Sequence, residues 1–117
     1  LLNRERTQRG LEGLTWCDSC ADVARAHSRD MYRHGYFSHI DSAGDDPFDR
    51  MQAAGITYEA AGENLSIAPT LAAAHASLMG SPDHRENILR DLFDSVGIGC
   101  YRGPYGFMCT QIFRDTP

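Results

Sequence analysis

The sequence predicts an α+β domain in which a mixed or antiparallel sheet is covered by helices on both faces. The chain has 117 residues, which is the length of one domain with a single modest core. The predicted elements follow the order helix, helix, strand, helix, helix, strand, strand. A tight turn joins the last two strands, so they must be antiparallel. The order also lacks the strand–helix alternation of a doubly wound parallel sheet.

The first third of the chain shows helix signals with clear ends. Residues 1–6 are typical of the end of a helix with Gly10 as its C-cap, which indicates that the N-terminal helix is truncated. A long helix is predicted over residues 16–34. Thr15-Trp16-Cys17-Asp18 fits a capping box at its start, and Gly35 ends it.

The remaining elements are each marked by a capping or turn residue. They are a short helix from Asp46-Pro47 to about Gly55, a mixed strand and loop over 56–67, an Ala-rich helix from Pro69 or Thr70 to Met79, a short helix with Ser81 as N-cap and Pro82 at its first position, and a hairpin of strands 95–101 and 106–113.

Charge and hydropathy exclude two broad functional classes. The net charge is −5 and the pI is about 5.4, which argues against a nucleic-acid-binding protein, because such proteins need a basic surface to displace counterions. No apolar run approaches the roughly 20 residues that span a bilayer. The sequence contains no indication of an oligomeric state.

The four cysteines are compatible with two disulfides and an oxidising compartment. Cys100 and Cys109 flank Gly103-Pro104-Tyr105-Gly106. If the turn centres on the two middle residues, these cysteines lie opposite each other on the hairpin, where a cross-strand disulfide is geometrically reasonable. Cys17 and Cys20 are also within bridging range in a first helical turn. A crossed pairing, with one cysteine from each group, stays open.

The Cys17-x-x-Cys20 spacing also raises a redox or zinc-ribbon interpretation, because a helix N-terminus can lower the pKa of a thiol. However, the sequence predicts no βαβ unit around this motif, as a thioredoxin-like protein would have. Cys100 and Cys109 have eight residues between them, which is not a second zinc knuckle. Structural disulfides are therefore the preferred interpretation.

Of the five histidines, three have structural explanations. His27 and His75 lie among small apolar residues in amphipathic helices, which is typical of core or boundary histidines. His34 ends a helix, where the dipole favours a cation. His39 and His84 have no such explanation and are candidate functional residues.

His39, Glu63 and His84 are candidates for one polar site. His39 follows the aromatic pair Tyr36-Phe37 and precedes a polar loop, so its ring can lie at a cleft edge. His84 is in the first turn of its helix, where the dipole favours a neutral imidazole, as a metal ligand or general base requires. Glu63 lies in a weakly polar stretch and needs a partner, which a histidine or a cation would supply.

Eight segments, in a fixed order over essentially the whole chain, carry a family resemblance. They are Asn3-Arg4-Glu5-Arg6 with Gly10-Leu11 and Leu14-Thr15-Trp16; Ala26-His27-Ser28-Arg29-Asp30-Met31; Gly35-Tyr36-Phe37-Ser38-His39; Asp49-Arg50-Met51 with Ala54-Gly55-Ile56; Gly62-Glu63-Asn64-Leu65; Ser81-Pro82-Asp83-His84-Arg85 with Asn87-Ile88-Leu89; Val96-Gly97-Ile98-Gly99; and Thr110-Gln111-Ile112-Phe113. Together they resemble the CAP superfamily of cysteine-rich secretory, antigen 5 and pathogenesis-related proteins, and most of all its bacterial SCP-like extracellular members.

The resemblance implies a three-layer α-β-α sandwich with a central, mainly antiparallel sheet. It also implies a surface cleft lined by two histidines and acidic residues, which binds divalent cations in several relatives. Carried over by position, the metal-binding residues are His39, Glu63 and His84, and further cleft residues are Asn64 and Ser81. Ser81 stands where the larger eukaryotic relatives place a second glutamate, and Met108 where they place a second histidine.

Two functional hypotheses follow. The first is a secreted, extracellular or periplasmic module without catalysis, which binds a divalent cation such as Zn²⁺, a small ligand or an extracellular surface component. Two neutral imidazoles and one carboxylate can hold Zn²⁺ with an open position. The second is a hydrolase that uses a metal-activated water or a His/Glu acid–base pair. Ser81 is expected to be a poor nucleophile, because an N-cap hydroxyl faces backbone amides. The binding module is therefore preferred.

Overall fold

The computed structural model of the chain describes residues 1–104 and 106–117 and confirms the predicted α+β fold. Tyr105, which the sequence predicts in the hairpin turn, lies outside the described residues. The elements are α1 (Leu2–Thr7), β1 (Thr15–Trp16), α2 (Asp18–His34), α3 (Pro47–Ala53), β2 (Ala60–Ala68), α4 (Leu71–Met79), α5 (Pro82–Leu89), β3 (Ser95–Gly103) and β4 (Gly106–Asp115).

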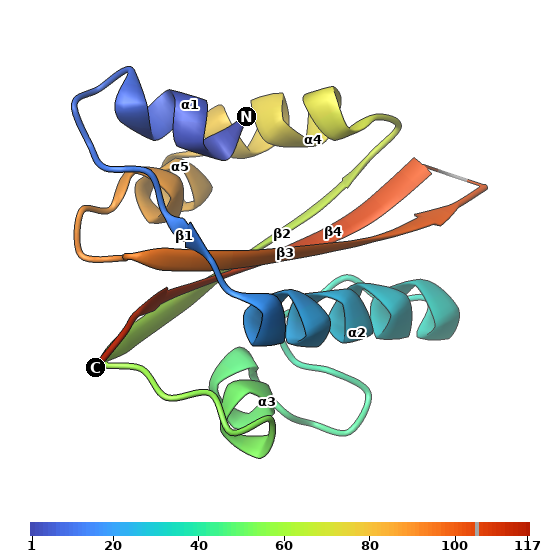
Figure 1. Cartoon of the computed structure of the whole chain (residues 1–117). Helices are drawn as coiled ribbons and strands as arrows, with labels where there is room; N and C mark the ends of the chain where they lie inside the picture. Colours follow the sequence, from blue (N-terminus) through green and yellow to red (C-terminus); the bar gives the residue numbers. More distant parts are fainter. Residues whose placement is uncertain (105) are drawn as a thin grey trace.

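The strands form one sheet in the order β1-β3-β4-β2, which places β2 at an edge. Both β2 and β3 pair with β4 in antiparallel fashion, whereas the short β1 is parallel to β3. The expectation of a mainly antiparallel sheet is thus met in part. Figure 1 shows α1, α4 and α5 on one side of the sheet and α2 and α3 on the other.

The start of α2 differs from the prediction. Thr15 and Trp16 do not begin the helix but form β1, paired with Ser95 and Val96. Cys17 is the N-cap, and its Sγ accepts a hydrogen bond from the Cys20 backbone N–H. The predicted capping box at Thr15 was wrong because pairing with β3, a contact distant in sequence, extends the backbone at these residues.

Helix α2 lies unusually close to the sheet because two glycines of β3 face it. A Cβ atom on Gly97 would lie 2.1 Å from the backbone nitrogen of Ala21, and one on Gly99 would lie 2.2 Å from that of Arg25. No side chain fits in these gaps. The helix backbone therefore rests directly on β3, and this contact fixes the position of every residue that α2 carries.

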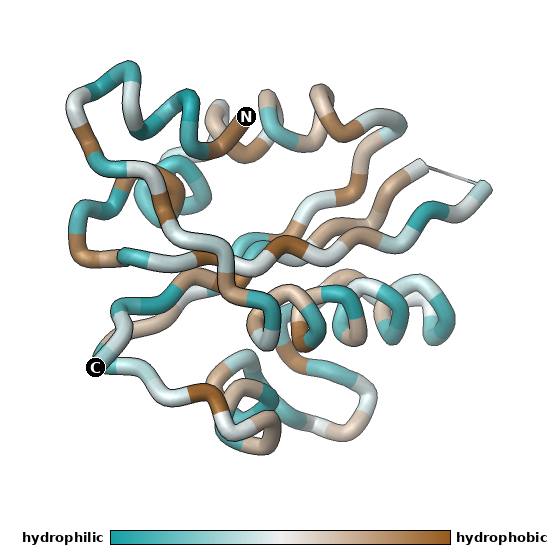
Figure 2. Tube along the Cα trace, in the orientation of Figure 1, coloured by the Kyte–Doolittle hydropathy of each residue, from teal (hydrophilic) through white to brown (hydrophobic). Residues whose placement is uncertain are grey.

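Buried apolar residues fill both sides of the sheet, and Figure 2 shows hydrophobic segments along β3 and β4 between the helices. On the side of α1, α4 and α5, the core consists of Leu2, Leu14, Leu78, Ile88, Phe93, Val96 and Phe113. On the side of α2 and α3, it consists of Cys17, Cys20, Ala24, Met51, Ile56 and Ile112. A smaller cluster of Met31, Leu65 and Met108 extends this second core.

Both predicted disulfides are present, and the crossed pairing is excluded. Cys17 is bonded to Cys20, and Cys100 is bonded to Cys109. The second pair lies directly opposite in the register of β3 and β4, as the spacing around the turn predicted.

Candidate functional site

His39 lies in the loop that follows α2, and the backbone before it is anchored in the core. The buried His27 of α2 donates from Nε2 to the carbonyl oxygen of Ser38, at 2.8 Å. Burial lowers the pKa of His27, since desolvation penalises the imidazolium, and nearby Arg50 acts in the same direction. His27 is the core histidine that the sequence predicted, and it holds the peptide unit next to His39.

The imidazole of His39 is bonded to Glu63 of β2. His39 Nδ1 lies 2.7 Å from Glu63 Oε1. An ionised carboxylate only accepts hydrogen bonds, so Nδ1 carries the proton and donates. The Glu63 side chain is 1% exposed, whereas that of His39 is 52% exposed. The pair therefore consists of a buried acid and a half-exposed ring whose other nitrogen, Nε2, is left for an outside group.

Arg50 of α3 completes this arrangement, and sequence reasoning missed it. Its Nη2 donates to the second carboxylate oxygen of Glu63, Oε2, at 2.8 Å. Its Nη1 donates to the carbonyl oxygens of His39, at 2.9 Å, and Asp45, at 3.0 Å. The Arg50 side chain is only 11% exposed. Glu63 was expected to need a histidine or a cation as partner, and it has both.

Asn64, the next residue of β2, is buried in a second polar cluster. Its side-chain amide donates to the backbone carbonyl of His84, at 3.0 Å, and to Gln111 Oε1, at 3.1 Å. Its carbonyl oxygen accepts from Asn87 Nδ2, at 2.9 Å. These bonds tie the first turns of α5 to the edge strand, so Asn64 positions the backbone of His84.

The His84 imidazole contacts Ser81, with 2.9 Å between Nδ1 and the serine Oγ. Ser81 occupies the N-cap position of α5 as predicted, but its hydroxyl makes no capping hydrogen bond. The argument that capping would make this hydroxyl a poor nucleophile was therefore wrong. The imidazole competes for the hydroxyl because residues three apart meet on the first helical turn.

The two histidines approach β2 from different faces of the sheet. Successive residues of a strand point to opposite faces, so Glu63 faces α3 while Asn64 faces α5. His39 and His84 accordingly belong to two clusters on either side of an edge strand. Among residues 1–104 and 106–117, no three His, Cys, Asp or Glu side chains are grouped so as to hold a metal ion. The predicted ligands thus do not form a ready three-ligand cage.

A comparison with protein families identifies the chain. The family described as "CAP: Cysteine-rich secretory protein family" matches residues 1–113. The chain belongs to the CAP family. The resemblance seen in the sequence is therefore confirmed.

Individual relatives of this CAP domain are bacterial. It is 38% identical over 114 residues to the uncharacterized protein YkwD of Bacillus subtilis, covering 97% of this chain and 44% of that protein. It is 32% identical to the uncharacterized membrane protein YlbC of the same bacterium, covering 90% of this chain and 31% of that protein. The CAP domain thus spans less than half the length of these curated relatives. None of the helices described in it is long and apolar enough to cross a membrane.

Solved structures share the fold of this CAP domain. An extracellular protein containing an SCP domain from Bacillus anthracis matches with a TM-score of 0.89 and 32% identity, covering 98% of this chain and 38% of that one. An outer surface protein from Borrelia burgdorferi matches with a TM-score of 0.91, covering 99% of this chain and 87% of that one. At 17% identity, the second likeness shows the fold alone.

Two carboxylates hold the His39 loop of the CAP domain in place. Asp30 accepts hydrogen bonds from the Tyr36 hydroxyl and from Ser42, and Asp41 accepts from the backbone N–H groups of Ala43 and Asp45. Burial alone would raise the pKa of each carboxyl, but these hydrogen bonds outweigh it, and both pKa values lie below the ordinary 3.8. The loop is therefore fastened by groups that must stay ionised.

Replacing Arg50 with Met should destabilise the fold by about 3 kcal/mol, because it leaves the Glu63 carboxylate buried without its cation. Urea unfolding followed by circular dichroism measures the change. Arg29→Met is the matched control, since Arg29 is exposed on α2 and its loss should cost less than about 0.5 kcal/mol. Equal unfolding midpoints for the two variants would show that the Arg50–Glu63 pair contributes no stability.

Acid should release the His39 loop before it unfolds the sheet. The pKa values of Asp30 and Asp41 are lower in the folded than in the unfolded chain, so their contribution is complete above the unfolded value and is lost as pH falls through the folded value. Below about pH 4, the amide resonances of Ser42 and Ala43 should therefore shift in NMR spectra. The Thr110 amide of β4 serves as the reference. Loop amides unchanged down to pH 2, about two units below the ordinary pKa, would contradict this account.

Proposed function

We propose that this CAP domain is an extracellular binding module in which the imidazole of His39 contacts a divalent cation. The observation that carries the proposal is the 2.7 Å hydrogen bond between His39 Nδ1 and Glu63 Oε1. A carboxylate bonded to one ring nitrogen fixes the orientation of the ring and makes the other nitrogen a better ligand. The exposed half of His39 gives an ion access to Nε2.

The residues of the site can supply two imidazole ligands to a cation more readily than the three direct ligands that the sequence predicted. Both oxygens of Glu63 are already bonded, one to His39 and one to Arg50, so Glu63 acts as a positioning carboxylate. His84 is the second imidazole of the proposal: Ser81 contacts its Nδ1, and its Nε2 would reach the same ion around the edge of the sheet at β2. Zn²⁺ accepts imidazole nitrogens readily, and water would supply its remaining ligands.

The disulfides support the proposed extracellular location. All four cysteines of the chain are paired, which is typical of proteins in an oxidising compartment. The relative from Bacillus anthracis is itself described as an extracellular protein.

Titration calorimetry with Zn²⁺ tests the proposal. The wild-type domain should bind one ion, and His39→Ala should abolish that binding because the principal ligand is lost. Glu63→Gln should weaken it by about 10- to 100-fold, since the amide still fills the space but orients the ring less firmly. His34→Gln is the matched control and should bind as wild type does, because it removes an exposed imidazole at the end of α2 but keeps a hydrogen-bond donor near Asp30. Equal binding by wild type and His39→Ala would reject the proposal.

The contact between Ser81 and His84 favours a second candidate function, a hydrolase. A hydroxyl hydrogen-bonded to an imidazole is the first requirement of a nucleophile with its base, and the two atoms lie 2.9 Å apart. A fluorophosphonate probe distinguishes the candidates. Covalent labelling at Ser81 that disappears in His84→Ala would replace the binding module with a hydrolase. If the binding module is correct, we expect no labelling of the wild-type domain.

A further inference from the structure

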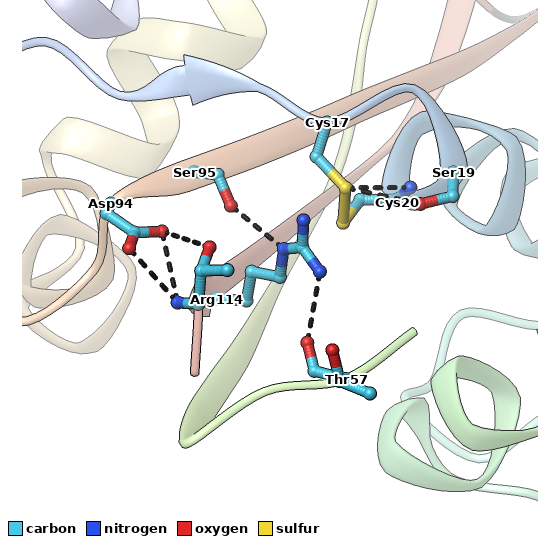
Figure 3. Close-up of a disulfide and its surroundings, with 8 residues drawn as sticks. Cys17, Ser19, Cys20, Thr57, Asp94, Ser95 and Arg114 are labelled. Atoms are coloured by element: carbon cyan, nitrogen blue, oxygen red, sulfur yellow. Dashed lines mark hydrogen bonds between the residues drawn. A yellow bond between two sulfur atoms is a disulfide. The ribbon is translucent and has the colours of Figure 1, made fainter. Parts of the chain in front are cut away.

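The disulfide between Cys17 and Cys20 has no part in the proposed binding site. It lies at the junction where β1 ends and α2 begins (Figure 3). Trp16, the last residue of β1, precedes Cys17 directly in the sequence. A redox role was disfavoured from the sequence because no βαβ unit was predicted around this motif. The structure places the two-residue strand β1, parallel to β3, directly before the helix, although α2 is followed by α3 and not by a strand that pairs with β1. A strand that leads into C-x-x-C at a helix start is one part of the context of thiol–disulfide exchange sites.

The surroundings of Cys17 Sγ favour a negative charge on that sulfur. Cys17 is the N-cap of the 17-residue α2, and its Sγ accepts the Cys20 backbone N–H at 3.1 Å. The Ser19 hydroxyl lies 3.5 Å from the same sulfur. Unpaired N–H groups at a helix start carry a partial positive charge. These groups would stabilise a Cys17 thiolate and thereby the reduced form of the pair.

The second disulfide lacks these features and serves as an internal reference. Cys100 and Cys109 face each other within the antiparallel pair of β3 and β4, and neither is the N-cap of a helix. No hydrogen bond reaches either sulfur from the part of the chain that the structure describes. Reduction of this pair would gain no comparable stabilisation of a thiolate.

Access to the first disulfide is restricted to one sulfur. Cys17 is 5% exposed and Cys20 is fully buried. Next to Cys17, Trp16 is 52% exposed. Cys17 is thus the outer member of a largely buried pair and the sulfur that an incoming thiol would reach first. The exposed aromatic surface of Trp16 beside it is available for contact with the partner.

We propose that Cys17–Cys20 is a thiol–disulfide exchange site that accepts two electrons from an external dithiol. The partner's thiolate attacks Cys17 Sγ, the bond between the two sulfurs breaks, and Cys20 leaves as a thiolate that takes up a proton. The partner's second thiol, losing its proton, then attacks its own sulfur in the mixed disulfide and releases Cys17 as a thiolate. The partner ends as a disulfide and the domain as a dithiol, so electrons and atoms balance.

Equilibration with glutathione tests the proposal on the unmodified chain. The domain is held in buffers of graded glutathione to glutathione disulfide ratio, acid-quenched, alkylated and digested, and each cysteine pair is quantified by mass spectrometry. The equilibrium constant for reduction should be at least about tenfold larger for Cys17–Cys20 than for Cys100–Cys109, equivalent to roughly 30 mV for a two-electron couple. Equal constants, or easier reduction of Cys100–Cys109, would overturn the proposal.

Single-cysteine variants test which sulfur reacts. Cys20→Ala leaves Cys17 as a thiol at the helix start, and Cys17→Ala leaves Cys20 in the core. With iodoacetamide at pH 7, Cys17 should be alkylated at least about tenfold faster than Cys20. Ser19→Ala should lower the equilibrium constant for Cys17–Cys20 alone, because it removes a donor to the Cys17 sulfur. A Ser19→Ala effect of equal size on both disulfides would contradict the role assigned to the hydroxyl.

Discussion

The ion pair between Glu63 and Arg50 is the interaction on which the candidate site depends. A carboxylate with 1% exposure cannot stay ionised in a protein interior without a cation and hydrogen-bond donors. Arg50 provides the cation, and the same guanidinium group also holds the backbone of the His39 loop. One buried side chain thus joins α3, β2 and the loop. This charge pair therefore sets the orientation of the His39 ring, and the exposed half of that ring forms the outer surface of the site.

The position of β2 at the sheet edge explains why the site has two halves. A central strand would have neighbours on both sides, and side chains from its two faces could not approach a common ligand. At an edge, groups from the α3 side and from the α5 side can both reach the rim of the sheet. The alternation of Glu63 and Asn64 therefore gives one strand two tasks. Glu63 orients an imidazole, and Asn64 fixes the backbone that carries the other.

Sequence reasoning succeeded where a feature is decided locally and failed where it depends on a distant contact. Asp46 caps α3 and Thr70 caps α4, because each side chain accepts a hydrogen bond from the backbone N–H three residues on. The strand β1 was missed because two residues become a strand only when β3 lies beside them. Arg50 was missed for the same reason, since nothing near it in the sequence shows that a buried Glu63 is its partner. The residue pattern and the family resemblance both pointed to His39 and Glu63, but neither identified Arg50 as the cation that holds them.

Helix α2 carries residues that belong to both the exchange site and the binding site. Because its backbone contacts β3 directly, a change at one end of the helix does not move the other. Cys17 begins the helix, and His27, ten residues on and about 15 Å along its axis, holds the peptide before His39. The helix position is fixed between these points by direct backbone contact at Gly97 and Gly99, which the disulfide does not create. A reduced Cys17 would still offer its sulfur to the Cys20 amide as an N-cap. Reduction would therefore change the chemistry at the start of α2 without moving His27 or the imidazole of His39.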